Sequence, residues 1–148
     1  MSALIIPLIL LFHEEAVRRF LIKKSPEIIL RSIALNEDIQ KEANLSKEEV
    51  EFLKSAYFEL EKETEKIKSN IKIKEIEIQE IINSEKIDFD KIEKIIKEIS
   101  NLNEELRLKQ IRSFKKVYEK LGSEKFKEIR KILKEYRKEK RRKLKGEE

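Results

Sequence analysis

The sequence of 148 residues contains no Cys and no Trp, one His, one Met, and two residues each of Gly and Pro. Without Cys the chain forms neither disulfides nor thiolate metal sites, although this absence assigns no compartment. Helix-breaking residues are rare and 44% of the residues are charged, and such a composition is typical of long helices. The length suits one domain with one modest core.

Residues that support catalysis are also scarce. The sequence has no Gly-rich phosphate-binding loop, and a nucleophile–base–orienter triad would depend on His13, which follows an apolar run. We therefore expect no enzyme. His13, beside Glu14 and Glu15, is the one candidate metal ligand, because transition metals favour His, Cys and Met. A lone His of this kind is usually an ordinary polar residue, so we predict no cofactor.

The first 25 residues contain an uninterrupted apolar run at positions 3–12 (ALIIPLILLF). A membrane-spanning helix needs about 20 apolar residues. A secretory signal has an apolar region of this length, but here no basic residue precedes the run and no cleavage site is evident. Three interpretations stay open: an export signal or membrane anchor, a buried or partner-docking segment, and an artefact of start-site choice. The first predicts a periplasmic protein or one anchored in the membrane and facing the periplasm, and the cytoplasm is the alternative.

Local signals predict where the first helices begin. Pro26 suits the first turn of a helix, and we expect a short helix over residues 26–42. Ser46 and Glu49 have the spacing of a capping box, in which each side chain accepts a hydrogen bond from the backbone N–H of the other. They predict the start of a long helix over residues 46–83.

The second half of the chain repeats this pattern. Asp88 is placed to cap another long helix, and Gly122 is expected to end it in the left-handed conformation. Ser123 then begins a last helix, and residues 144–148 form a fraying tail. Apolar residues recur every three or four positions along both long helices, which predicts an antiparallel pair. The predicted fold is all-α, a long antiparallel helical hairpin with short flanking helices over residues 26–143.

Two short segments carry a resemblance to a known family. Residues 45–49 (LSKEE) and residues 121–125 (LGSEK) each open a helix, with Leu45, Ser46, Glu49, Leu121, Ser123 and Glu124 as the motif and capping residues. This arrangement resembles the periplasmic LTxxQ-motif family typified by Spy, CpxP and ZraP, which includes heavy-metal sensors of the CnrX type. The first copy has Ser for Thr and Glu for Gln. The second copy departs further, with Gly122 for Thr and Lys125 for Gln.

The resemblance implies a four-helix protomer in a cradle-shaped homodimer. It also implies extracytoplasmic stress protection, either by ATP-independent binding of unfolded proteins or by modulation of a membrane stress sensor. The alternatives are a membrane-tethered sensor or resistance protein that responds to heavy metals, and a cytosolic coiled-coil adaptor. In this family a metal ion is a possible ligand, which the residues of this chain support poorly.

Two sets of residues are candidates for a client or dimer surface. Apolar side chains point away from the hairpin seam, and basic side chains lie near the end of the second long helix: Phe58, Ile73, Ile76, Arg107, Arg112, Lys115 and Lys116. Residues 127–145 hold eleven Lys or Arg against three Glu, a local charge of +8 that leaves −3 for the rest of the chain. Aromatic residues are sparse there, so we expect a solubilising tail and no nucleic-acid binding.

Overall fold

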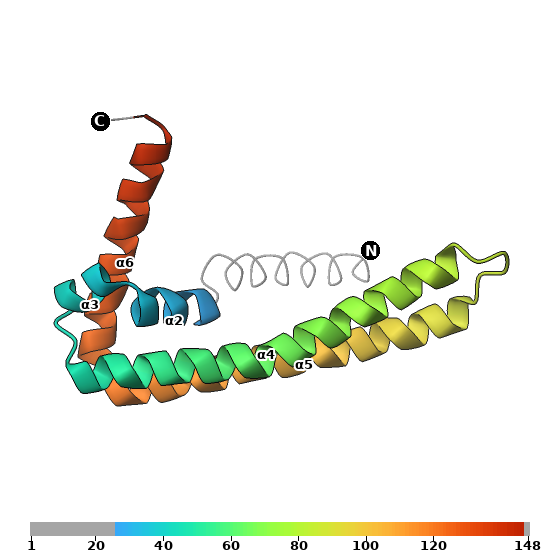
Figure 1. Cartoon of the computed structure of the whole chain (residues 1–148), viewed down its shortest axis with the longest axis horizontal. Coiled ribbons are helices and arrows are strands. Elements are labelled where there is room, and N and C mark those ends of the chain that lie inside the picture. The colour runs from blue at the N-terminus through green and yellow to red at the C-terminus, as the bar shows by residue number, and fades with distance from the viewer. Residues whose placement is uncertain (1–25, 147–148) are drawn as a thin grey trace, which may run out of the picture.

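The computed structural model describes residues 26–146, and these residues form five helices and no strand (Figure 1). The helices are α2 (Pro26–Leu35), α3 (Glu37–Glu42), α4 (Lys47–Ile82), α5 (Phe89–Leu121) and α6 (Ser123–Leu144). The long helices α4 and α5 form an antiparallel hairpin, which confirms the predicted all-α hairpin fold. In the described part of the chain, no helix combines the length and the apolar character needed to cross a membrane.

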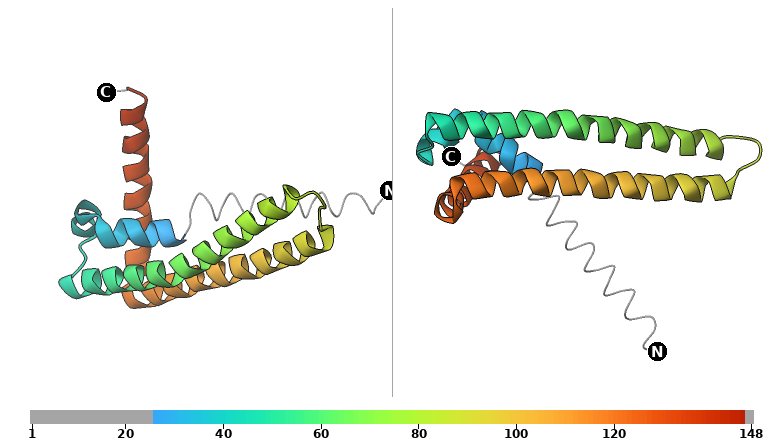
Figure 2. Two further views of the ribbon diagram at one scale, coloured as in Figure 1. Left: turned by 45° about the vertical axis from the view of Figure 1, so that its right-hand side comes forward. Right: turned by 90° about the horizontal axis from the view of Figure 1, so that it is seen from below.

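The ends of the hairpin helices follow from their capping residues. Ser46 and Glu49 form the expected capping box at the start of α4, and the Asp88 side chain accepts a hydrogen bond from the Lys91 N–H at the start of α5. With 36 and 33 residues, the two helices are each about 50 Å long. The shorter helices lie at the end of the hairpin opposite the turn, where α2 packs against both α4 and α5 (Figure 2).

The segment 26–42, predicted as one helix, is two helices, so the described chain has five where four were expected. The break occurs at Asn36, whose extended backbone lets its side chain accept hydrogen bonds from the N–H groups of Asp38 and Ile39. Asn is among the best N-cap residues because its short side chain competes with the helical backbone for hydrogen bonds. A new helix therefore starts where continuation was expected.

The backbone conformation of Gly122 also differs from the expectation. Its φ of 85° is positive, but its ψ of 159° is far from the left-handed helical region and belongs to a region that essentially only Gly adopts. Gly122 also serves as the N-cap of α6, where no side chain caps the helix. Ser123 is the first residue of α6, which confirms the predicted start of this helix.

The hydrophobic core lies at the base of the hairpin and draws on all five helices. It is a cluster of fourteen buried residues: Leu30, Ile33, Ala34, Ile39, Ala43, Leu53, Tyr57, Leu60, Val117, Leu121, Phe126, Ile129, Ile132 and Leu133. Beyond Ile67 no residue of α4 is buried, and α5 has one buried residue, Ile95, before Val117. Residues 69–105, here called the arm, are therefore a pair of helices that nothing else in the described chain covers.

Candidate binding surfaces

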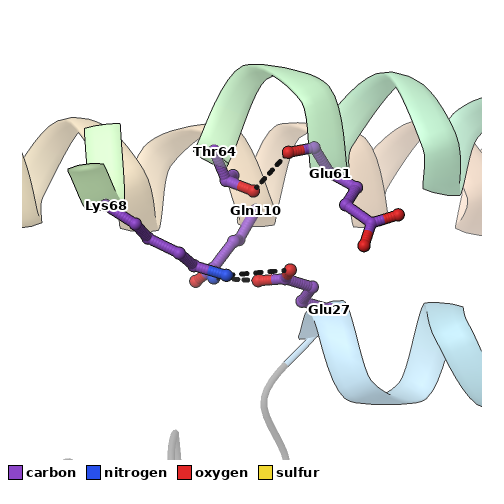
Figure 3. Close-up of polar contacts among 5 residues, drawn as sticks. All are labelled: Glu27, Glu61, Thr64, Lys68 and Gln110. Carbon is purple, nitrogen blue, oxygen red and sulfur yellow. Dashed lines mark hydrogen bonds and ion pairs between the residues drawn. The ribbon is translucent and has the colours of Figure 1, made fainter. Parts of the chain in front are cut away.

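The outer limit of the core is set by Glu27, in the first turn of α2. Its carboxylate pairs with the Lys68 ammonium at 3.3 Å and accepts a hydrogen bond from Gln110 Nε2 at 2.7 Å (Figure 3). Beside them, Thr64 is fully buried and its hydroxyl donates to the Glu61 carbonyl at 3.3 Å. These contacts join α2 to both long helices, so the start of α2 is fixed where the arm begins.

The two family-like motifs meet at the base of the hairpin. The Ser46 N–H donates to Glu49 Oε1 and the Glu49 N–H donates to Ser46 Oγ, each at 3.1 Å. Lys125, from the second motif, donates to the same Glu49 oxygen at 2.7 Å. Leu45 packs against the core and Leu121 is part of it, whereas Ser123 and Glu124 are exposed. The motif residues therefore join helices at the base.

The Glu49 carboxyl has a pKa below its ordinary value. Burial by itself raises this pKa. The hydrogen bond from Lys125, the two hydrogen bonds with Ser46 and the nearby Lys125 charge each lower it, and together they outweigh the effect of burial. Glu49 is thus held in its charged form between α4 and α6. The sequence showed the capping box but gave no signal for the contact with Lys125, which depends on tertiary structure.

Ion pairs across the hairpin fix which residues of α4 and α5 lie level. Glu63 pairs with Lys109 at 3.4 Å, and Lys74 pairs with Glu98 at 2.6 Å. By this register Phe58 lies level with the base of α5, near residue 114, whereas Ile73 and Ile76 belong to the arm. Fifteen residues of helix, about 22 Å, separate Phe58 from Ile73. The candidate apolar residues therefore do not form one patch.

The candidate basic residues are also separate from the arm. Arg107, Arg112, Lys115 and Lys116 are exposed and lie level with the base, and Lys115 pairs with Glu119 of its own helix at 3.9 Å. The arm holds six Lys against ten Asp or Glu, a net charge of −4. The apolar candidates Ile73 and Ile76 thus lie in an acidic region, apart from the basic candidates.

The arm exposes several large apolar side chains. Phe89 is 69% exposed and Ile73 is 61% exposed, and the others that are at least one third exposed are Ile76, Ile82, Ile87 and Ile96. A shallow groove of about 380 Å³ runs between the helices beside Ile73, with the Lys74–Glu98 pair among its lining residues. The hydrogen bond from Lys74 lowers the pKa of the Glu98 carboxyl, which favours the charged form of Glu98.

No group of three or more His, Cys, Asp or Glu residues within 26–146 is arranged to hold a metal ion. The candidate ligand His13 and the apolar run at 3–12 lie outside the described residues.

Comparison of the chain with family models, with curated proteins and with solved structures gives no match. The resemblance to the LTxxQ-motif family therefore rests on the motif residues alone and stays a prediction.

Proposed function

We propose that this protein is a stress-protection protein that binds non-native polypeptide segments without ATP, on the exposed apolar side chains of the arm. The observation that carries the proposal is the contrast between base and arm. The base buries fourteen residues in one core, while the arm displays six large apolar side chains that nothing in the described chain covers. A concentration of exposed large apolar side chains in one region is typical of interaction sites.

The free energy available from the apolar side chains of the arm favours weak, reversible binding of polypeptide segments. Full burial of an Ile or Phe side chain contributes about 1.5–3 kcal/mol, so covering six half-exposed side chains contributes about 5–9 kcal/mol in total. Association costs at least about 4 kcal/mol in lost translational and rotational freedom. The balance of at most about 5 kcal/mol corresponds to a dissociation constant of about 0.2 mM or weaker, which suits transient capture of unfolded protein. The charge of −4 on the arm favours apolar segments flanked by Lys or Arg.

Suppression of aggregation tests the proposal. The full chain, at a stoichiometric ratio and without nucleotide, is expected to slow the aggregation of several unrelated chemically or thermally unfolded proteins, measured by light scattering. The double substitution Ile73→Gln and Ile76→Gln removes apolar area from exposed positions of the arm, so it is expected to reduce the effect while the circular dichroism spectrum stays unchanged.

A matched control substitutes exposed apolar residues of α5 that lie outside the arm. Leu108 and Ile111 are 44% and 48% exposed, and their replacement by Gln is expected to leave suppression close to that of the unsubstituted protein. Equal loss in both double variants would show that binding is not localised to the arm. If the full chain slows the aggregation of none of the tested proteins, the proposed function is wrong.

A further inference from the structure

A second surface, distant from the arm, lies where α6 crosses α2. A groove of about 510 Å³ is formed there by Ile29 of α2 and by one face of α6. Among the described residues, seven basic side chains line it, from Lys127 at one end to Arg141 at the other, and no acidic side chain does. Ligand-binding clefts commonly have a volume between about 300 and 1,000 Å³.

The basic and the acidic side chains of α6 lie on different faces of the helix, which explains why all the charged residues that line the groove within 26–146 are basic. The basic lining residues recur at spacings of three and four, so they share one face of the helix. The four Glu residues of α6, at positions 124, 128, 135 and 139, are spaced by four or seven residues, which places them on a neighbouring face, and they are absent from the lining. Within residues 26–146 one lining residue, Lys138, forms an ion pair, with Glu135 of its own helix at 3.6 Å.

The floor of the groove is apolar. Ile29 and Leu133 lie between the basic side chains, and Leu133 is 7% exposed, so it is recessed below them. A ligand that carries only phosphates makes no contact with such a floor, and the lining residues within 26–146 include no aromatic side chain on which a base could stack. A flat bilayer that rests on the basic side chains does not reach a recessed floor.

We propose that this groove binds an acidic amphipathic helical segment of a partner protein. From Lys127 to Arg141 the basic face extends about 21 Å, the length of a helix of about 14 residues. Glu or Asp at spacings of three and four along one side of such a helix would oppose the basic residues. An apolar side chain between them would contact Ile29 and Leu133. The charge steers the encounter, and the apolar contact adds selectivity for one face of the partner helix.

Fluorescence anisotropy with a designed peptide tests the proposal on the full chain. The probe is a fluorescein-labelled, helix-forming 18-residue peptide with Glu on one face and Leu beside it. The reference peptides replace either all Glu by Gln or all Leu by Ser. We expect the probe to bind and both reference peptides to bind more weakly. Equal binding of the probe and the Leu→Ser peptide would show that the apolar floor has no role and would overturn the proposal.

Two triple variants of α6 locate the site. Lys131→Gln, Lys134→Gln and Arg137→Gln remove three charges from the groove. The matched control, Lys140→Gln, Arg142→Gln and Lys143→Gln, removes the same charge from the same helix outside the groove. We expect the first variant to weaken peptide binding about tenfold and the control to weaken it less than about threefold. Equal weakening would indicate non-specific attraction to a basic helix and overturn the proposal.

Three further measurements distinguish other occupants. Tighter binding of a 20-base-pair DNA duplex, or of phosphatidylglycerol–phosphatidylcholine vesicles, that is lost in the groove variant would assign the groove to phosphates. Self-association that the groove variant abolishes, measured by sedimentation equilibrium, would assign it to a second copy of the chain. The groove variant is expected to retain suppression of aggregation, because the arm is unchanged. Failure of the groove proposal is therefore distinguishable from failure of the proposed function.

Discussion

The side chain of Gln40 provides a sharp test of how the base is stabilised. It is 8% exposed, and its Nε2 donates hydrogen bonds to the carbonyls of Ile33 and Ala34, both at 2.9 Å. These carbonyls belong to the last turn of α2 and lose their helical partners because the chain breaks at Asn36. Gln40 therefore caps the C-terminus of α2 from within α3.

Replacement of Gln40 by Leu keeps the approximate size of the side chain and removes both donors. Each buried carbonyl left without a partner costs about 1–3 kcal/mol, so the two together cost about 2–6 kcal/mol, and the gain from a buried Leu offsets part of this cost. We expect the free energy of unfolding to fall by about 2–4 kcal/mol in urea titrations, with an unchanged m-value. Gln79→Leu on the exposed surface of α4 is the control, with an expected change within about 0.5 kcal/mol. Equal effects of the two substitutions would refute this account of α2 capping.

The remaining predictions concern the two connections at the base. Ser46→Ala removes an N-cap and should lower the free energy of unfolding by about 1 kcal/mol, whereas Ser46→Thr stays close to the original protein; unchanged melting in the Ala variant contradicts the capping role. In Gly122→Ala the new Cβ meets no atom within 4 Å, so the expected loss of about 1–3 kcal/mol in urea unfolding comes from the backbone conformation, and a neutral result excludes this strain. Because the pKa of Glu49 is lowered by folding, its ionisation stabilises the protein above the unfolded-state pKa, and this contribution is lost as the pH falls through the folded-state pKa. Glu49→Gln keeps the capping box, so its deficit in unfolding free energy should be largest near pH 7 and disappear once the pH lies below the folded-state pKa of Glu49; a deficit independent of pH would exclude the charge as its cause.

The hairpin was predictable because its determinants are local and periodic. The capping box of Ser46 and Glu49 needs only four consecutive residues, and the apolar spacing of three and four holds over many turns of both helices. The break at Asn36 was missed because an Asn within an apolar periodicity is compatible with either a helix interior or a cap. Gln40 was missed for a related reason, since its two acceptors become available only once that break exists.

The sequence predicted the exposure of the candidate surface residues but not their position relative to one another. Helical periodicity gives the direction of a side chain around its own helix, and it placed Phe58, Ile73 and Ile76 correctly on exposed positions. It does not give the level at which two antiparallel helices meet, which the Glu63–Lys109 and Lys74–Glu98 pairs set. Without that register, the basic residues of α5 could not be placed away from the arm.

The distribution of charge connects the two proposed surfaces. The arm carries −4 and residues 127–145 carry +8, and the last sixteen residues of α5, about 24 Å, lie between them. This length exceeds the Debye length of about 10 Å at 0.1 M salt, so within one molecule the two regions barely interact. Between molecules they can approach closely, and a basic groove with an apolar floor is complementary to an acidic arm with exposed apolar side chains. Added salt weakens such an association, whereas a dimer formed through the apolar side chains of two arms keeps its stability. If two copies associate in this way, the ionic strength is expected to determine whether a second copy competes with the partners proposed for either surface.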